Sequence, residues 1–313
     1  CRVINLASYR FRLSVSFSFV ICCTFSLQYY YKMSEHKSSL NISDFYEHED
    51  VSLEYIMENV LYVEKKDDDD SEFQHLEREY NSILLNGCDC NSEKINCIKC
   101  LHGRNYKWLS EATELVLDVD KCEDLIYECS SACKCDPSKC SNRLVQNGPR
   151  AGLKVVHSNI FKSKGLISSE LIPRGGFICE YAGEILSFKE ASKRLKKYEQ
   201  ILDKNYILFM KEWNKNQVLK NPITTIIDPT QKGNIGRYIN HSCDPNCEIR
   251  CVRIDCPIPK IAVFAKRDIK AGVELCFHYN GGDEILLKVQ RRLCLCRSAN
   301  CSGYMPYANI ELP

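Results

Sequence analysis

Cysteine is the residue with the clearest capacity for chemistry in this chain of 313 residues. Of the 21 cysteines, nine lie between positions 88 and 140, in the spacings C-x-C, C-x2-C and C-x3-C-x-C-x4-C. Zinc prefers four tetrahedral ligands, and two cysteines one to four residues apart supply two of them. Three zinc ions that share three bridging thiolates take nine ligands, the number present. We therefore predict a zinc cluster held by Cys88, Cys90, Cys97, Cys100, Cys122, Cys129, Cys133, Cys135 and Cys140. The alternative for Cys122 is a free thiol.

A second group of cysteines follows near position 300. Cys294, Cys296 and Cys301 supply three ligands, and Cys243 in RYINHSCDPNC is the candidate for the fourth. We expect one more zinc ion here. A disulfide framework is the alternative interpretation, but the odd number of cysteines and their clustered spacings favour metal.

The segments GRYINHSCDPN and ELCFHY resemble the SET-domain protein lysine methyltransferases. The segments LHGRNY, YECSSACKC, NRLVQNG, FICEYAGEIL and KIAVFAKRDI extend the likeness over roughly residues 50–313. With a cysteine-rich segment before and C-x-C-x4-C after, the chain is similar to the suppressor-of-variegation class, and most of all to the SET portion of SETMAR-type proteins. The resemblance implies a mainly β, pseudo-knotted SET fold of the β-clip type, with flanking cysteine-rich zinc modules and one or two helices.

The resemblance also implies a reaction, the transfer of methyl groups from S-adenosylmethionine to a lysine amine. A free lysine has a pKa of about 10.4, so an apolar channel must favour its neutral, nucleophilic form. By their places in ELCFHY and CEYAGE, Tyr279 matches the catalytic tyrosine and Tyr181 a second tyrosine of the lysine channel. Phe277 matches the position that sets the number of methyl groups, and a phenylalanine there predicts di- or trimethylation.

The likeness assigns further residues to the cofactor pocket. The family's first cofactor loop usually reads lysine-glycine-tryptophan-glycine, whereas this chain has FKSKGLISSELIP and lacks the tryptophan. A shortened loop there would remove backbone partners of the cofactor and weaken its binding. Tyr304 matches an aromatic position that packs on the adenine once the last zinc site has formed. The pocket residues that we predict are Lys164, Gly165, Leu166, Tyr206, Arg237, Asn240, His241 and Tyr304.

Short strands and one long helix must position these side chains. The β-branched and aromatic runs GLKVV, GFICEYAGEIL, ITTIID and KIAVFA, each between turn signals, predict strands. Ser187 and Glu190 form a capping-box pattern at the start of SFKEASKRLKKYEQILDKNY, which carries apolar residues at helical spacing. A helix is predicted there.

Charge and cysteine content divide the chain. Residues 33–87 hold 15 acids and 4 bases, and residues 88–313 hold 34 bases and 26 acids. An apolar stretch before Met33 could be a signal or an anchor, but four serines interrupt it, and no membrane association is expected. The predicted divisions begin with an untranslated or non-structural leader at 1–32 and an acidic, partly flexible segment at 33–87 with the pre-SET lead-in from about 51. A pre-SET zinc module at 88–149, a SET catalytic domain at 150–285 and a post-SET zinc module at 286–313 follow.

The resemblance predicts a histone-lysine methyltransferase in the nucleus and on chromosomes. Its expected partners are the histone H3 tail, with the ninth-position lysine favoured, and the nucleosome. The whole chain has a net charge of only +1, and zinc thiolates lower the positive charge of the cysteine-rich part, so no direct sequence-specific DNA binding is expected. The alternative is a zinc-stapled module that binds a histone tail or another chromatin partner without methylating it.

Overall fold

The computed structural model of this chain describes stretches that all belong to one compact unit, Asp44–Pro313. These stretches are residues 52–63, 71–84, 86–90, 100–109, 114–122, 125–201, 205–212, 222–279 and 292–306. The predicted leader, residues 33–51 of the acidic segment and Cys97 lie outside them. Within them, no helix has both the length and the apolar character that crossing a membrane requires.

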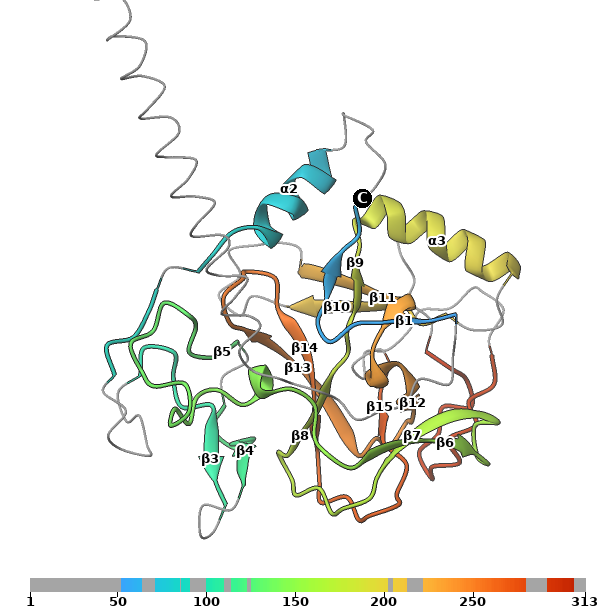
Figure 1. The fold of residues 1–313 in the computed structure, drawn as a ribbon. Helices are drawn as coiled ribbons and strands as arrows, with labels where there is room; N and C mark the ends of the chain where they lie inside the picture. The colour runs from blue at the N-terminus through green and yellow to red at the C-terminus, as the bar shows by residue number, and fades with distance from the viewer. Residues whose placement is uncertain are drawn as a thin grey trace, which may run out of the picture. The chain divides into compact units, whose positions relative to one another are not determined.

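Two mixed sheets form the centre of this unit (Figure 1). The first has the order β1-β11-β9-β2, with β10 also paired to β11. The second has the order β5-β13-β14-β8. The strands of the first sheet are β1 (Glu54–Tyr55), β2 (Val60–Leu61), β9 (Gly183–Ile185), β10 (Leu208–Glu212) and β11 (Ile223–Gly233). Those of the second are β5 (Ile126–Tyr127), β8 (Phe177–Glu180), β13 (Cys247–Arg253) and β14 (Lys260–Ala265).

Three two-stranded ladders complete the strands of the described residues. Two are antiparallel: β3 (Tyr106–Trp108) with β4 (Leu115–Leu117), and β6 (Leu153–Ser158) with β7 (Ser163–Ser168). The third joins β12 (Asn240–His241) to β15 (Cys276–Phe277) in parallel. The predicted strand segments all form strands, because β-branched and aromatic side chains fit the half-buried faces of these sheets.

The main apolar core lies between the sheets and beneath the β6–β7 hairpin. Its buried members include Leu166, Ile178, Ile227, Ile239 and Phe277. A second core cluster packs the β3–β4 hairpin against the second sheet through residues such as Leu117, Ile126, Val252 and Phe264. These two clusters hold the strands that carry the candidate site.

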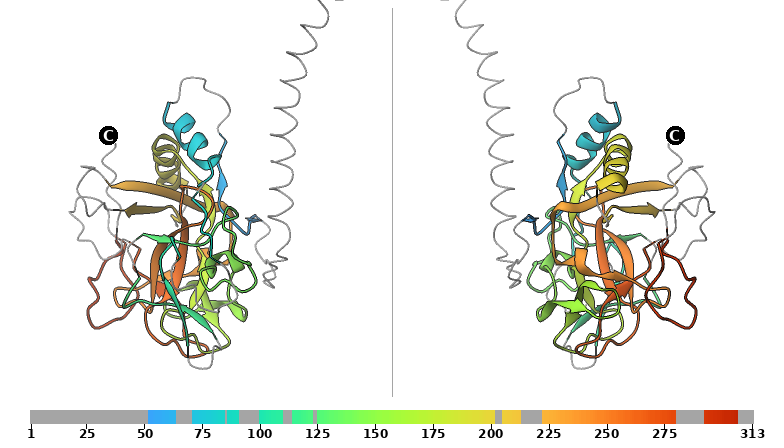
Figure 2. Two further views of the ribbon diagram at one scale, coloured as in Figure 1. Left: turned by 90° about the vertical axis from the view of Figure 1, so that its left-hand side faces the viewer. Right: turned by 90° about the vertical axis from the view of Figure 1, so that its right-hand side faces the viewer.

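Two α-helices lie at one end of the sheets, α2 (Ser71–Tyr80) and α3 (Phe188–Ile201) (Figures 1 and 2). The predicted helix start is confirmed, because the Ser187 hydroxyl accepts a hydrogen bond from the Glu190 backbone N–H at 3.2 Å. Leu76 and Tyr80 of α2 pack on the main core. The two helices also touch, since the backbone N–H of Phe188 donates to the Glu72 carboxylate at 2.6 Å.

The segment that leads into β12 passes close to the link between β8 and β9. It begins with the short 3-10 helix η3 (Ile235–Tyr238), whose N-cap is Asn234. The Asn234 side chain donates to the Glu180 carbonyl at 2.7 Å and accepts from the Ala182 backbone N–H at 3.2 Å. At Gly236 a Cβ atom would stand 2.7 Å from the Glu180 carbonyl oxygen, so only glycine allows this close passage. A second 3-10 helix, η2 (Val145–Asn147), precedes β6.

Candidate active site and cysteine clusters

The pairing of β12 with β15 brings the motifs GRYINHSCDPN and ELCFHY into contact. Asn240 lies opposite Cys276, and His241 opposite Phe277. The Ser242 N–H extends the pairing by donating to the Phe277 carbonyl at 3.1 Å. Because β12 and β15 pair over only two residues each, their alignment depends mainly on the core beneath them and on the contacts of neighbouring side chains.

Two tyrosine hydroxyls beside this strand pair are held by backbone carbonyls. The Tyr279 hydroxyl donates to the Ile239 carbonyl at 3.0 Å, and the Tyr181 hydroxyl donates to the Tyr206 carbonyl at 2.6 Å. Burial raises the pKa of both tyrosines above the ordinary value of 10.0. Both hydroxyls therefore stay neutral at physiological pH, and each oxygen keeps lone pairs for a further partner.

Phe277 lies between these two tyrosines. Its ring centroid is 6.0 Å from that of Tyr181 and 4.9 Å from that of Tyr279. Phe277 is 2% exposed and Tyr181 is 5% exposed, so both rings lie where water has little access. Aromatic faces attract cations, and burial disfavours a charged amine. This group of three rings is suited to hold a lysine side chain next to a positively charged methyl donor.

Glu274 and Asn240 attach the β6–β7 hairpin to β12. The Asn240 amide donates to the Lys164 carbonyl at 3.0 Å and to the Glu274 carboxylate at 2.8 Å. The Ser158 hydroxyl donates to the same carboxylate at 2.7 Å. At Gly165 a Cβ atom would collide with that carboxylate, so a larger residue here would displace the end of the Glu274 side chain. Within the segment that lacks the family's tryptophan, residues 163–168 form β7, which pairs with β6 along its whole length.

His241 links the aromatic group to a cysteine group. It is 1% exposed, and its Nδ1 accepts from the Tyr279 backbone N–H at 3.3 Å. Its Nε2 lies 3.5 Å from the Cys243 sulfur. Burial, with a smaller contribution from His278, lowers the pKa of His241 to about 4. The imidazole is therefore neutral near pH 7, as acceptance at Nδ1 requires.

The other predicted cofactor residues stand around the same strand pair. The Arg237 guanidinium carbon lies 4.5 Å above the ring of Tyr206, and Arg237 is buried. The Lys164 ammonium lies 5.6 Å from the Tyr238 ring centroid. Leu166 is fully buried in the main core. Tyr304, by contrast, is 41% exposed.

Among the residues that the structure describes, seven cysteines that precede β6 in the sequence form one cluster. Their sulfur atoms lie close to tetrahedral spacing: Cys88 and Cys129 are 3.8 Å apart, and Cys100 and Cys129 are 3.5 Å apart. Four thiolates around zinc, each at about 2.3 Å, would be about 3.8 Å from one another. The donor set and its spacing therefore fit zinc. The cluster, here called the cysteine cluster, contains Cys88, Cys90, Cys100, Cys129, Cys133, Cys135 and Cys140.

Cys122, which the sequence assigned to this cluster, lies elsewhere. It packs against the second core cluster, near Tyr106 and Leu117. Its backbone N–H donates to the Asp118 carbonyl at 2.7 Å, which closes the turn after β4. In the described part of the chain, Cys122 belongs to none of the residue groups whose ligand atoms converge.

The second predicted metal group does come together. Cys243, Cys294, Cys296 and Cys301 place their sulfur atoms within 4.8 Å of one another. The Cys243 sulfur is 3.9 Å from that of Cys294 and 4.0 Å from that of Cys301. An isolated bridge between Leu293 and Tyr304 closes the surrounding loop. Four thiolates at this spacing suit one tetrahedral zinc ion.

Two side chains with evident roles in this geometry were not predicted. Glu274 is the first residue of the ELCFHY motif. The one feature of the sequence that could have indicated its role is an acidic residue directly before a run of buried residues. His102 follows Cys100 by two residues, and its Nδ1 lies 3.4 Å from the Cys100 sulfur. The signal for His102 was its position beside a predicted ligand.

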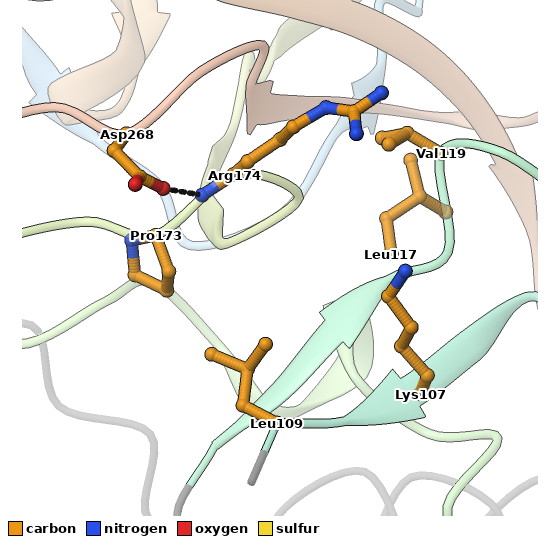
Figure 3. A pocket seen from close by; sticks show the side chains of 7 residues that line it. All are labelled: Lys107, Leu109, Leu117, Val119, Pro173, Arg174 and Asp268. Carbon is orange, nitrogen blue, oxygen red and sulfur yellow. Dashed lines mark hydrogen bonds between the residues drawn. The ribbon is translucent and has the colours of Figure 1, made fainter.

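A surface hollow of about 190 Å³ lies apart from these groups (Figure 3). The β3–β4 hairpin forms one wall, and the turn at Pro173 and Arg174 forms another. The Arg174 backbone N–H donates to the Asp268 carboxylate at 2.7 Å, which fixes that turn. None of the predicted site residues lines the hollow.

Comparison with known proteins settles the family. The family model described as SET domain matches residues 163–280. The chain is 37% identical over 235 residues to "Probable histone-lysine N-methyltransferase set-23" of Caenorhabditis elegans, covering 74% of this chain and 91% of that protein. This chain belongs to the SET-domain histone-lysine N-methyltransferases.

Solved structures agree with this assignment. The methyltransferase domain of human histone-lysine N-methyltransferase SETMAR superimposes with a TM-score of 0.64 at 31% identity, covering 82% of this chain and 89% of that one. Arabidopsis thaliana SUVH6, solved in complex with SAM, gives a TM-score of 0.62 at 26% identity, covering 84% of this chain and 52% of that one. The predicted family and the predicted mainly β SET fold are confirmed.

Proposed function

We propose that this SET-domain methyltransferase moves methyl groups from S-adenosylmethionine to a lysine of the histone H3 tail, with the ninth-position lysine favoured. The observation that carries the proposal is the group of Tyr181, Phe277 and Tyr279 rings beside the β12–β15 pair. SUVH6 in complex with SAM supports the choice of cofactor. The resemblance to the suppressor-of-variegation class supports the choice of histone and lysine.

The three aromatic residues have distinct roles in this proposal. S-adenosylmethionine, when bound, supplies the electrophilic methyl group. The Tyr279 oxygen, held by the Ile239 carbonyl, orients the lysine nitrogen in line with that methyl group. Tyr181 and Phe277 form the channel that excludes water and favours the neutral amine. Because Phe277 has no hydroxyl to hold a water molecule, the channel accepts methylated lysine again, which supports a di- or trimethylated product.

The cofactor pocket in this proposal surrounds the β12–β15 pair. Arg237 and Tyr206 form a stacked wall, and Asn240 ties the hairpin backbone to β12. Tyr304 closes the pocket on the adenine once its loop is fixed by zinc. The residues proposed to line it are Lys164, Gly165, Leu166, Tyr206, Arg237, Asn240, His241 and Tyr304.

Zinc has a structural role in the proposal. We assign three ions to a pre-SET module at 88–149 and one to a post-SET module at 286–313, completed by Cys243. The SET catalytic domain at 150–285 lies between these modules. The compact cysteine cluster and the group of four sulfur atoms support these assignments.

A chromatin role follows from the family, and we place the protein in the nucleus, on chromosomes, with the nucleosome as partner. The absence of direct sequence-specific DNA binding stays a prediction. Methylation of histone H3 is a change to the tail of a nucleosomal protein, so the substrate itself brings the enzyme to chromatin.

The proposal is tested by incubating an H3 tail peptide with the zinc-loaded protein and S-adenosylmethionine, followed by mass spectrometry. The expected result is a ladder of methylated peptide with the wild type and none with Tyr279→Phe, which lacks the orienting oxygen. Tyr80→Phe is the matched control, because the Tyr80 hydroxyl also donates to a backbone carbonyl, that of Asn59, at 3.4 Å. It should leave the ladder unchanged.

Turnover of Tyr279→Phe at the wild-type rate would refute the role of Tyr279. No methylation by a folded, zinc-loaded wild type would refute the enzyme and favour a histone-tail binding module. Peptides with the ninth-position lysine replaced by arginine test the choice of lysine in the same assay.

A further inference from the structure

The structure assigns His102 to the metal site of the cysteine cluster: we propose that its Nδ1 binds zinc together with the thiolates of Cys88, Cys100 and Cys129. The inference rests on the proposed zinc cluster and adds the identity of its ninth ligand. Cys122, which packs against a different part of the core, is then not a ligand.

Distances around the His102 ring support coordination. Its Nδ1 lies 3.4 Å from the sulfur of Cys100, 3.8 Å from that of Cys129 and 3.9 Å from that of Cys133. A nitrogen and a sulfur that share a tetrahedral zinc ion, at about 2.0–2.1 Å and 2.3 Å from it, stand about 3.6 Å apart. His102 also converges with Cys88, Cys100 and Cys129, the four ligand atoms all lying within 4.8 Å of one another. These four residues form a three-cysteine, one-histidine set.

The other ring nitrogen of His102 forms a hydrogen bond to a backbone carbonyl, as the second nitrogen of a metal-bound histidine often does. His102 Nε2 lies 2.9 Å from the backbone carbonyl oxygen of Asn86. A carbonyl oxygen only accepts, so Nε2 carries the hydrogen in this contact. In the neutral ring, that leaves Nδ1 with its lone pair directed at the sulfur atoms. A carbonyl that fixes the tautomer and orientation of a histidine is the usual outer partner of a zinc ligand.

The alternative is a charged ring whose Nδ1–H donates to one sulfur. A single hydrogen serves one acceptor well, whereas here three sulfur atoms lie within 0.5 Å of the same distance from Nδ1. Coordination accounts for the closeness of Cys100 and Cys129, which form one converging set with Cys88 and His102, because a central ion places all its ligands at similar distances from one another.

The number and the charge of the ligands follow from this assignment. Seven of the nine cysteines first assigned to the cluster lie in it, and Cys97 lies outside the described residues. With Cys97 as predicted from the sequence, His102 restores the nine ligands that three bridged zinc ions take. Because imidazole is neutral and a thiolate is not, the cluster carries one negative charge less than an all-cysteine cluster. The cysteine-rich surface is less acidic as a result.

The direct test is NMR of the full chain, free of any affinity tag, with an NMR-active cadmium isotope in place of zinc and nitrogen-labelled histidine rings. We expect the Nδ1 resonance of His102, identified by its absence in His102→Ala, to be split by coupling to cadmium. A His102 resonance without that coupling, in a protein whose cysteine sites are filled with cadmium, would overturn the assignment. This readout needs no methylation activity.

Zinc release provides a second measurement, using a colorimetric chelator under reducing conditions. His102→Ala should release part of its zinc at least about tenfold faster than the wild type, since loss of an outer partner alone weakens metal binding 10–100-fold. His102→Cys should restore wild-type retention, because thiolate suits the same position. His75→Ala, at a histidine whose side chain is 67% exposed on α2, is the matched control and should behave as wild type.

Wild-type zinc retention by His102→Ala would refute the assignment while leaving the zinc cluster itself intact. A wild type that binds no zinc at all would instead refute the cluster on which the assignment depends. Should His102→Ala not fold, His102→Cys and the cadmium coupling of the wild type still decide between coordination and a hydrogen bond.

Discussion

Tyr279 and Tyr181 keep their protons to unusually high pH, because burial raises the pKa of each above 10.0. The methyl-transfer rate should therefore rise with pH as the substrate lysine loses its proton, without a falling limb from tyrosine ionisation below about pH 10. Initial rates between about pH 7 and pH 10, with circular dichroism to confirm folding, test this.

The pH dependence of folding stability sets the highest pH at which these rates can be measured. In the unfolded chain these tyrosines ionise near pH 10, whereas in the folded chain they remain neutral above it. The stability that they contribute is thus complete below about pH 10 and is lost as pH rises further. A rate that declines with rising pH below about pH 10, in a protein that is still folded, would contradict the protonated state assigned to Tyr279.

Phe277 offers a second test at the level of one side chain. Phe277→Tyr should shift the products toward monomethyl-lysine, because a hydroxyl between Tyr181 and Tyr279 can hold water where further methyl groups would go. The product ladder by mass spectrometry is the measurement. Phe209→Tyr, at a partly buried position of β10, is the control, and an unchanged ladder in Phe277→Tyr would refute the role of this position.

At the scale of elements, α3 is joined to the first sheet by a buried ion cluster. The Arg194 guanidinium contacts the carboxylates of Glu184 at 2.6 Å, Asp228 at 2.7 Å and Glu190 at 2.9 Å. Asp228 is fully buried and also accepts from the Tyr198 hydroxyl at 2.8 Å. These contacts fix the angle of α3 over β9 and β11.

Arg194→Ala should lower the free energy of unfolding by about 3–5 kcal/mol, because it leaves buried carboxylates without their cation. Denaturant unfolding followed by circular dichroism measures the loss. Lys193→Ala is the control: its side chain is 68% exposed, and its ion pair with Glu190 is worth at most about 1 kcal/mol. Equal shifts in the two variants would contradict a structural role for the buried cluster.

Elements with a strong local pattern could be predicted from the sequence, and others could not. The α3 start was readable because Ser187 caps the helix within its own segment. The strands β1, β2, β5 and β12 have two residues each, too few for alternation to show. Their partners lie far away in the chain, as in Glu54 opposite Lys232. Such pairings are set by the shared core, which no local pattern reveals.

The same distinction holds within the site. Tyr279, His241 and the group of Cys243, Cys294, Cys296 and Cys301 lie in motifs long enough to be recognised. The structure brings these motifs together. Glu274 and His102 act through contacts with distant segments, which the order of residues does not show. Cys122 was assigned to the cysteine cluster because it completed a set of nine ligands. Spacing along the chain does not reveal that its thiol packs against the second core cluster instead.

At the scale of the whole molecule, the cysteine cluster has little other than cysteine in its core. Removing zinc with a strong chelator under reducing conditions should therefore unfold this cluster and the group around Cys243, and abolish methylation. Hydrogen exchange measured by mass spectrometry should increase in residues 125–143 and 292–306 before it increases in β14, which is buried in the second sheet. Return of zinc should reverse the change, and uniform exchange throughout the chain would contradict it.

The long-range parallel pairs have a consequence during synthesis of the protein. Tyr55 cannot find its partner Gly233 until the ribosome has added the intervening residues, and His241 waits likewise for Phe277. At about 5–20 residues per second, the first interval lasts roughly 10–35 s. Throughout that time the nascent chain displays unpaired strand edges. Cys243, Cys294, Cys296 and Cys301 are not yet made, so the zinc ion of that group cannot bind. Chaperone occupancy and zinc supply at the ribosome should therefore govern how much active enzyme a cell obtains.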